Sequence, residues 1–179
     1  MLQKETTALA LIDVQGKLAT LMDGREELYR QLQILVKGAQ ALELPIFWME
    51  QYPEGLGPTI PELAELLPNQ QPLAKRCFSA CGQEEFRNGL QKSGRRQVIV
   101  AGIETHICVY QTARDLLDEE YHVEVVADAV SSRTAANKEI GIEKMRRAGA
   151  GITSVETVLF ELLREAGSPQ FKEIARLVK

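Results

Sequence analysis

The chain has 179 residues, of which 45% are hydrophobic, and this length and composition are typical of one folded domain with a sizeable core. Its formal net charge is −4 at pH 7 and charges of both signs are interspersed, so the sequence indicates no surface for nucleic acid. We recognise no signal peptide, and no segment approaches the roughly 20 apolar residues that cross a membrane. Three cysteines form too sparse and odd a set for a disulfide framework, which predicts a reducing compartment, the cytoplasm.

Two kinds of segment alternate along the chain. Short apolar runs rich in β-branched residues predict buried strands, and apolar residues spaced three and four apart predict half-buried helices. The predicted strands are residues 8–14, 44–50, 71–75, 97–103, 122–128 and 151–155. The predicted helices are residues 24–42, 83–93, 106–119, 133–148 and 155–165, and a last helix that starts with Ser168 as N-cap and Pro169 as its first residue.

This alternation predicts an α/β fold in which residues 1–179 form a single domain. The expected architecture is a doubly wound, three-layer α/β/α sandwich around a mainly parallel six-stranded sheet. Ligands of such folds bind beyond the carboxyl ends of the strands. Residues 51–70 are rich in proline and predict a long functional loop that contains one short helix.

Three polar or reactive residues follow predicted strands. Asp13 ends the first strand, Lys75 ends the weak third strand, and Cys108 lies in the first helical turn after the fourth. Singly, they are explained equally well as a turn-forming Asp, a surface Lys and a buried small Cys. Together they would meet at one edge of the sheet. The helix dipole is expected to lower the pKa of the thiol, and a nearby carboxylate could accept and return its proton.

Three motifs resemble those of the isochorismatase-like cysteine hydrolases, a superfamily that includes nicotinamidases and N-carbamoylsarcosine amidases. They are LIDVQ (11–15), LAKRCFSA (73–80) and VIVAGIETHICVYQTARDL (98–116), and the resemblance extends over about residues 6–165. The segments MEQYPEGLGPTIPEL (49–63) and SVETVLFELL (154–163) look like the subgroup called isochorismatase domain-containing proteins.

The resemblance implies a role for each residue of the three motifs. Asp13 would be the catalytic base, Lys75 its partner and Cys108 the nucleophile. The family also has a cis peptide bond, here Ile103–Glu104, before the nucleophile loop. The backbone N–H groups of Glu104 and Cys108 would then form the oxyanion hole.

The expected reaction is hydrolysis of a C–N, amide-type bond of a small molecule through a Cys108 thioester. Family members that cleave a vinyl ether lack a cysteine at this position, so ether hydrolysis is the less favoured alternative. A noncatalytic binding or scaffold protein is a second alternative, and a redox role for Cys77 and Cys81 is a third, less favoured than simple burial. We expect no metal, because His106 and His122 do not match the nicotinamidase ligands, and no other cofactor. We also expect a homo-oligomer.

Six further residues flank the ligand-binding edge and are candidates for binding the substrate. Core packing is an equal alternative for Trp48 and Phe78, and a surface position without function is the alternative for Gln15. Thr105 is also expected to be the N-cap of the helix that carries Cys108. The six candidates are Gln15, Trp48, Gln51, Tyr52, Phe78 and Thr105.

Overall fold

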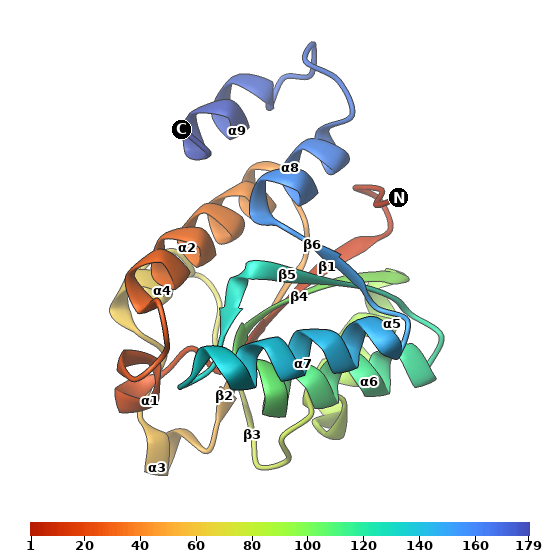
Figure 1. The fold of residues 1–179 in the computed structure, drawn as a ribbon. Helices are drawn as coiled ribbons and strands as arrows, with labels where there is room; N and C mark the ends of the chain where they lie inside the picture. The colour runs from red at the N-terminus through yellow and green to blue at the C-terminus, as the bar shows by residue number, and fades with distance from the viewer.

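The computed structural model describes all residues 1–179 and contains one six-stranded sheet in which every strand pair is parallel (Figure 1). The strand order is β3-β2-β1-β4-β5-β6. The predicted α/β class and parallel sheet are confirmed. The strands are β1 (Thr7–Ile12), β2 (Ile46–Gln51), β3 (Leu73–Lys75), β4 (Gln97–Ile103), β5 (His122–Ser131) and β6 (Gly151–Thr153).

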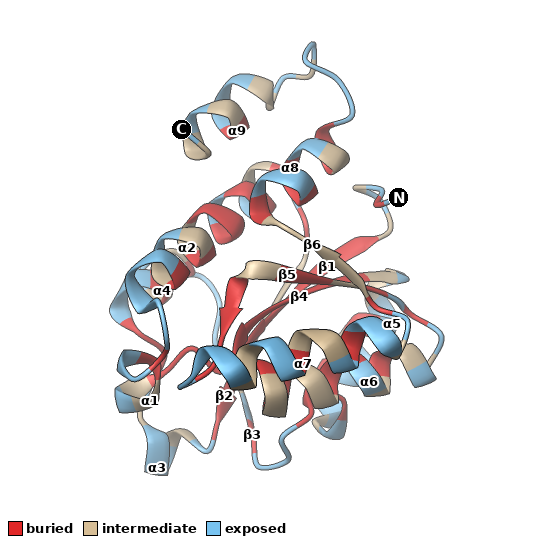
Figure 2. Cartoon of the chain, in the orientation of Figure 1, coloured by how far each residue is buried: buried red, intermediate tan, exposed pale blue.

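Helices cover both faces of the sheet (Figures 1 and 2). One face packs against α2 and α8, on which α9 lies, and the other packs against α5, α6 and α7. The bounds are α1 (Gly16–Thr20), α2 (Arg25–Ala41), α3 (Pro53–Leu56), α4 (Pro61–Ala64), α5 (Glu84–Ser93), α6 (Tyr110–Asp118), α7 (Ala135–Arg147), α8 (Val155–Leu163) and α9 (Phe171–Leu177), with a 3₁₀ turn at Ala80–Gly82 and a π turn at Thr105–Val109. None of the helices is long and apolar enough to cross a lipid bilayer.

The central position of β1 in the sheet explains why its sequence is a continuous apolar run. All six of its residues are buried. Leu9 and Leu11 belong to the core beneath α2 and α8, whereas Ala8 and Ala10 belong to the core beneath α5 and α6. Side chains of a strand alternate between its two faces, so a strand covered on both sides needs apolar residues at every position.

The order of the strands determines where a ligand can bind. From β1 the chain proceeds outward to β2 and β3, and then returns to β4 on the other side of β1. In doubly wound sheets the crevice at such a reversal, beyond the carboxyl ends of the strands, is the usual binding site. Here that position lies between the ends of β1 and β4, where Asp13 and Glu104 follow their strands.

Three predicted details are wrong. The last helix does not begin at Ser168 and Pro169, because the N–H of Phe171 bonds the carbonyl of Ser168 in a turn and Gln170 is the N-cap. Residues 51–70 contain two short helices, α3 and α4, rather than one, and each has a proline in its first turn. The helix predicted from residue 106 is preceded by the π turn and becomes α-helical only at Tyr110.

Candidate active site

The ends of three neighbouring strands bring Asp13, Gln51 and Lys75 together. Asp13 directly follows β1, and its backbone has the left-handed φ of 52°, which Asp tolerates better than most residues. Gln51 ends β2 and Lys75 ends β3, and the two residues are paired in the strand register. All three side chains are buried at the same edge of the sheet.

Lys75 and Asp13 form a buried ion pair. Lys75 Nζ lies 2.7 Å from Asp13 Oδ2, and the two side chains are 0% and 3% exposed. The ammonium also donates to Gln51 Oε1 at 2.7 Å and to the carbonyls of Cys77 and Phe78 at 3.2 and 2.8 Å. A buried ammonium is tolerated when its protons have acceptors, and here four oxygens surround three protons.

Two glutamines hold this ion pair in place. The Gln15 side chain accepts a bond from the Gln51 N–H at 2.7 Å and donates to the Gln51 and Gly57 carbonyls at 2.9 and 2.7 Å. The Gln51 side chain donates in turn to the Arg76 carbonyl at 2.8 Å. These bonds fix the orientation of both side-chain amides. As a result, Gln51 Oε1 points at Lys75 Nζ.

The turn that carries Cys108 is fitted closely against its surroundings. Gly102 has φ 119°, and a Cβ there would collide with the Ile12 carbonyl, so a glycine lets the end of β4 approach the end of β1. A Cβ at Gly141 of α7 would lie 2.8 Å from the backbone of Thr105 and His106. The Ile103–Glu104 peptide bond is cis.

Burial controls the protonation of Cys108. The residue is 7% exposed, and burial, with a smaller effect of the Asp13 carboxylate, raises the pKa of its thiol to about 12. The expected lowering of this pKa by a helix dipole is therefore wrong, because desolvation outweighs any favourable charge. Burial also raises the pKa of Asp13, against the opposing effect of Lys75. The Asp13 oxygen that is not bonded to Lys75, Oδ1, has no hydrogen-bond partner.

A second buried carboxylate, Glu104, belongs to the same site. Its side chain is 5% exposed and accepts bonds from Arg133, from Nε at 3.1 Å and from the backbone N–H at 3.0 Å. The Arg133 side chain itself is 53% exposed. Sequence reasoning gave Arg133 no role, because nothing in a local pattern relates it to a residue 29 positions earlier in the chain.

Asp13 and Cys108 line one cavity of about 120 Å³, which we call the Cys108 pocket. Gln15, Gln51 and Phe78, three of the six predicted substrate-binding residues, also line it. The apolar residues from α1, α3 and the turn after β4 were not predicted, because loop courses decide their positions. The ten lining residues are Asp13, Gln15, Leu18, Gln51, Leu56, Phe78, Ile103, Glu104, Ile107 and Cys108.

The other three predicted binding residues lie elsewhere. Trp48 is buried in the core and its Nε1 donates to Thr59 Oγ1 at 2.7 Å, so core packing is the correct alternative. Tyr52 is 41% exposed, with the Arg76 guanidinium 4.1 Å from its ring centre. Thr105 is fully buried and is not an N-cap, because Glu104 occupies that position and Thr105 Oγ1 has no partner.

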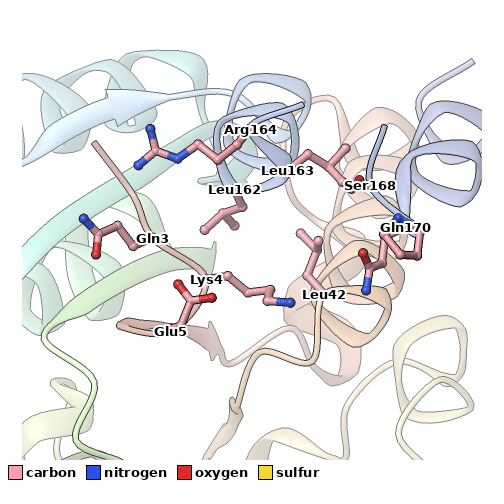
Figure 3. Close-up of a pocket in the computed structure, with 10 residues that line it drawn as sticks. Gln3, Lys4, Glu5, Leu42, Leu162, Leu163, Arg164, Ser168 and Gln170 are labelled. Atoms are coloured by element: carbon pink, nitrogen blue, oxygen red, sulfur yellow. The ribbon is translucent and has the colours of Figure 1, made fainter. Parts of the chain in front are cut away.

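A larger hollow of about 450 Å³ lies between the N-terminal segment and the end of α8 (Figure 3). We call it the terminal groove. No cysteine, histidine or buried charged residue lines it, and no group of three or more His, Cys, Asp and Glu side chains in the protein could hold a metal ion. The groove is lined by Gln3, Lys4, Glu5, Leu42, Leu162, Leu163, Arg164, Ser168, Pro169 and Gln170.

Comparison with known proteins agrees with this fold and shows the family. The family model of the isochorismatase domain matches residues 7–157. Isochorismatase domain-containing protein 2A of Mus musculus is 38% identical over 177 residues, which cover 98% of this chain and 84% of the relative.

Two solved structures have the same fold. MAR1 ribonuclease from Caenorhabditis elegans is 36% identical with a TM-score of 0.93, covering 99% of this chain and 91% of its own. The YcaC gene product of Escherichia coli, described as an octameric hydrolase of unknown specificity, is 27% identical with a TM-score of 0.92 over 98% of this chain and 88% of its own.

Proposed function

Because the chain belongs to the isochorismatase family, we propose that it is a cysteine hydrolase that cleaves the C–N bond of a small amide-type substrate through a thioester on Cys108. One observation carries the proposal. Asp13 and Cys108 line one small cavity, and Lys75, behind it, pairs with Asp13 Oδ2 while Asp13 Oδ1 is left without a hydrogen-bond partner. A nucleophile, a base and a group that holds the base are the parts that covalent catalysis requires.

In the first step the Cys108 sulfur attacks the substrate carbonyl. With a pKa of about 12 the thiol is protonated in the free enzyme, so its proton passes to Asp13 as the S–C bond forms. The electron pair of the C=O bond moves onto oxygen. The backbone N–H groups of Glu104 and Cys108 stabilise this oxyanion.

In the second step the tetrahedral intermediate collapses. The C–N bond breaks, Asp13 returns the proton to the leaving nitrogen, and a thioester remains on Cys108. Water then attacks the thioester and gives its proton to Asp13. The C–S bond breaks, the carboxylic acid leaves, and the proton on Asp13 returns to the sulfur, so the enzyme is regenerated.

Lys75 keeps Asp13 ready for this cycle. Its ammonium holds Oδ2 at 2.7 Å and leaves Oδ1 without a partner, in a residue that lines the same cavity as Cys108. Burial raises the pKa of Asp13, which makes its carboxylate a better proton acceptor than an exposed Asp. The pair therefore acts as a positioned base.

Three alternatives are weaker. Ether hydrolysis needs no thiol, and a binding or scaffold protein needs neither the thiol nor a base beside it. A ribonuclease activity, after the name of the Caenorhabditis elegans neighbour, would place a phosphate in the site, but none of the ten lining residues is a cation.

The octameric state of the Escherichia coli neighbour supports a homo-oligomer for this chain.

Ammonia release from a panel of small primary amides tests the proposal. Wild type should hydrolyse at least one member, and Cys108→Ala should lose the activity. Cys81→Ala is the matched control, because Cys81 is also buried and burial also raises the pKa of its thiol to about 12, but it does not line the Cys108 pocket. Equal activity of wild type and Cys108→Ala would refute the mechanism.

A further inference from the structure

The charge of the Cys108 pocket is unusual for a site that would recognise an acid. Among its ten lining residues the only ionisable groups besides the thiol are two carboxylates, those of Asp13 and Glu104. No lysine, arginine or histidine lines the cavity. A substrate carboxylate or phosphate would therefore lie beside two carboxylates that already have cations, and would find no cation of its own in the lining.

The two cations that pair with these carboxylates lie outside the lining of the cavity. Lys75 donates to Asp13, Gln51 and two backbone carbonyls, so its three protons are used. Arg133 donates from Nε to both oxygens of Glu104, at 3.1 and 3.2 Å. Burying a charge without a partner is costly, and repulsion between like charges is strongest where water is excluded.

A positive substrate is also disfavoured. Each carboxylate has its own cation, Lys75 for Asp13 and Arg133 for Glu104. An ammonium in the pocket would compete for Asp13 Oδ1, the atom that must accept the thiol proton. A neutral ligand avoids both costs.

The remaining lining residues set the size and polarity of the ligand. Leu18, Leu56, Phe78, Ile103 and Ile107 form an apolar wall. Leu56 and Phe78 are 39% and 54% exposed, so the mouth of the pocket is apolar too. A cavity of about 120 Å³ is smaller than the roughly 300–1,000 Å³ of sites for drug-sized ligands.

We propose that the Cys108 pocket selects small uncharged carbonyl compounds with a short apolar substituent, and rejects substrates of similar size that carry a carboxylate. The inference rests on the proposed function for the identity of the reacting group, but the charge selection can be measured without turnover.

Iodoacetamide and iodoacetate make the test direct, because they are nearly the same size and differ in charge. In both reactions the Cys108 sulfur bonds to the CH₂ carbon and iodide leaves. Peptide mass spectrometry gives the rate constant at Cys108 for each reagent, and exposed Cys77 in the same molecule is the internal reference. The ratio of the iodoacetamide rate to the iodoacetate rate should be at least about tenfold higher at Cys108 than at Cys77 and at free 2-mercaptoethanol.

A variant that adds a positive charge to the pocket tests the charge selection a second time. Leu18→Lys places an ammonium on the pocket wall and should bring the ratio at Cys108 toward that at Cys77. Leu21→Lys is the control, because Leu21 follows the same helix α1, is 51% exposed and does not line the pocket. It should leave the ratio unchanged, and thermal unfolding confirms that both variants fold.

The outcomes separate this inference from the proposed function. Equal ratios at Cys108 and Cys77 would overturn the charge selection, even if amides are hydrolysed. Failure of iodoacetamide to alkylate Cys108 at any pH at which the protein stays folded, while Cys77 is alkylated, would overturn it as well, because a small neutral amide would then not reach the thiol. A high ratio without hydrolysis of any amide would support the neutral-ligand pocket and refute the proposed reaction.

Discussion

The Cys108 pocket and the terminal groove differ in volume and in the polar groups that they bury. The groove is larger, about 450 Å³ against 120 Å³, yet it is lined by exposed or half-buried polar side chains and three buried leucines (Figure 3). The pocket contains buried Asp13, Gln15, Gln51 and Glu104. Burying such groups costs free energy unless each has partners, and a cluster of four at one point makes the pocket the candidate functional site.

The two regions also differ in how their polar atoms are used. In the groove, exposed Arg164 donates from Nη2 to the Leu2 carbonyl at 3.1 Å and from Nη1 to Met1 Sδ. In the pocket, Lys75 has four acceptors and Gln51 bonds both Lys75 and the Arg76 carbonyl. Buried hydrogen bonds are therefore concentrated at the proposed site, although its cavity is the smaller of the two.

Lys75→Met should have the largest effect on both activity and stability. It leaves the Asp13 carboxylate buried without its cation, which costs about 3–5 kcal/mol in the free energy of unfolding. Loss of a positioned base should lower kcat by roughly 10²–10⁴-fold. Urea unfolding and amide hydrolysis measure the two effects.

The same substitution in the terminal groove is the matched control. Lys4 is half-exposed, so Lys4→Met should change the unfolding free energy by less than about 0.5 kcal/mol and leave kcat unchanged. If the two variants were equally stable, the buried ion pair would have no role beyond that of a surface charge.

Gln51→Leu is expected to have an intermediate effect. It removes one acceptor from Lys75 and one donor to the Arg76 carbonyl, and each buried group left without a partner costs about 1–3 kcal/mol. Because Lys75 can then shift from Asp13, kcat should fall more than KM rises. Gln170→Leu in the groove is the control, and a Gln51→Leu enzyme with wild-type kcat would exclude a positioning role.

The pH dependence should show the raised pKa of Asp13. The base must be ionised, so kcat/KM should fall as the pH decreases through a pKa above the ordinary value of 3.8. The free energy of unfolding should change with pH in the opposite direction to kcat/KM. A pKa raised by folding favours the folded state below the unfolded pKa, and this contribution is lost as the pH rises through the folded pKa. An acidic limb of kcat/KM at or below 3.8 would contradict the assigned base.

Ser168→Ala should have the smallest effect. Ser168 Oγ in the terminal groove is a buried atom without a hydrogen-bond partner, as is Asp13 Oδ1 in the Cys108 pocket. Removing an unpaired hydroxyl costs nothing in lost hydrogen bonds, so stability should be unchanged or slightly increased. A fall in kcat for this variant would mean that the groove takes part in the reaction.

The sequence predicted those features that depend on strand order. Parallel strands bring their carboxyl ends to one edge, so the positions of Asp13, Lys75 and Cys108 at strand ends were sufficient to place them together. Features that depend on loop courses or distant pairing were not predictable. Leu18 and Leu56 reach the pocket from two short helices, and Arg133 reaches Glu104 from the end of β5.

The wrong predictions have physical causes. Side chains alternate between the two faces of β2, and this alternation directs Trp48 into the core beneath α2. The pKa of Cys108 was predicted from its place in a helical turn, but its direction depends on burial, which a local sequence pattern does not give. Thr105 fits the pattern of an N-cap, but the chain after β4 forms a π turn in which Glu104 takes that position.

Trapping of the acyl-enzyme tests the central claim most directly. Wild type, Asp13→Asn and Cys108→Ala would be mixed with propionamide, quenched in acid after increasing times and analysed by intact-protein and peptide mass spectrometry. The account predicts a propionyl adduct on Cys108 in wild type, none in Cys108→Ala, and formation at least about 100-fold slower in Asp13→Asn. Release of ammonia without any adduct, at the same rate in wild type and Cys108→Ala, would contradict it.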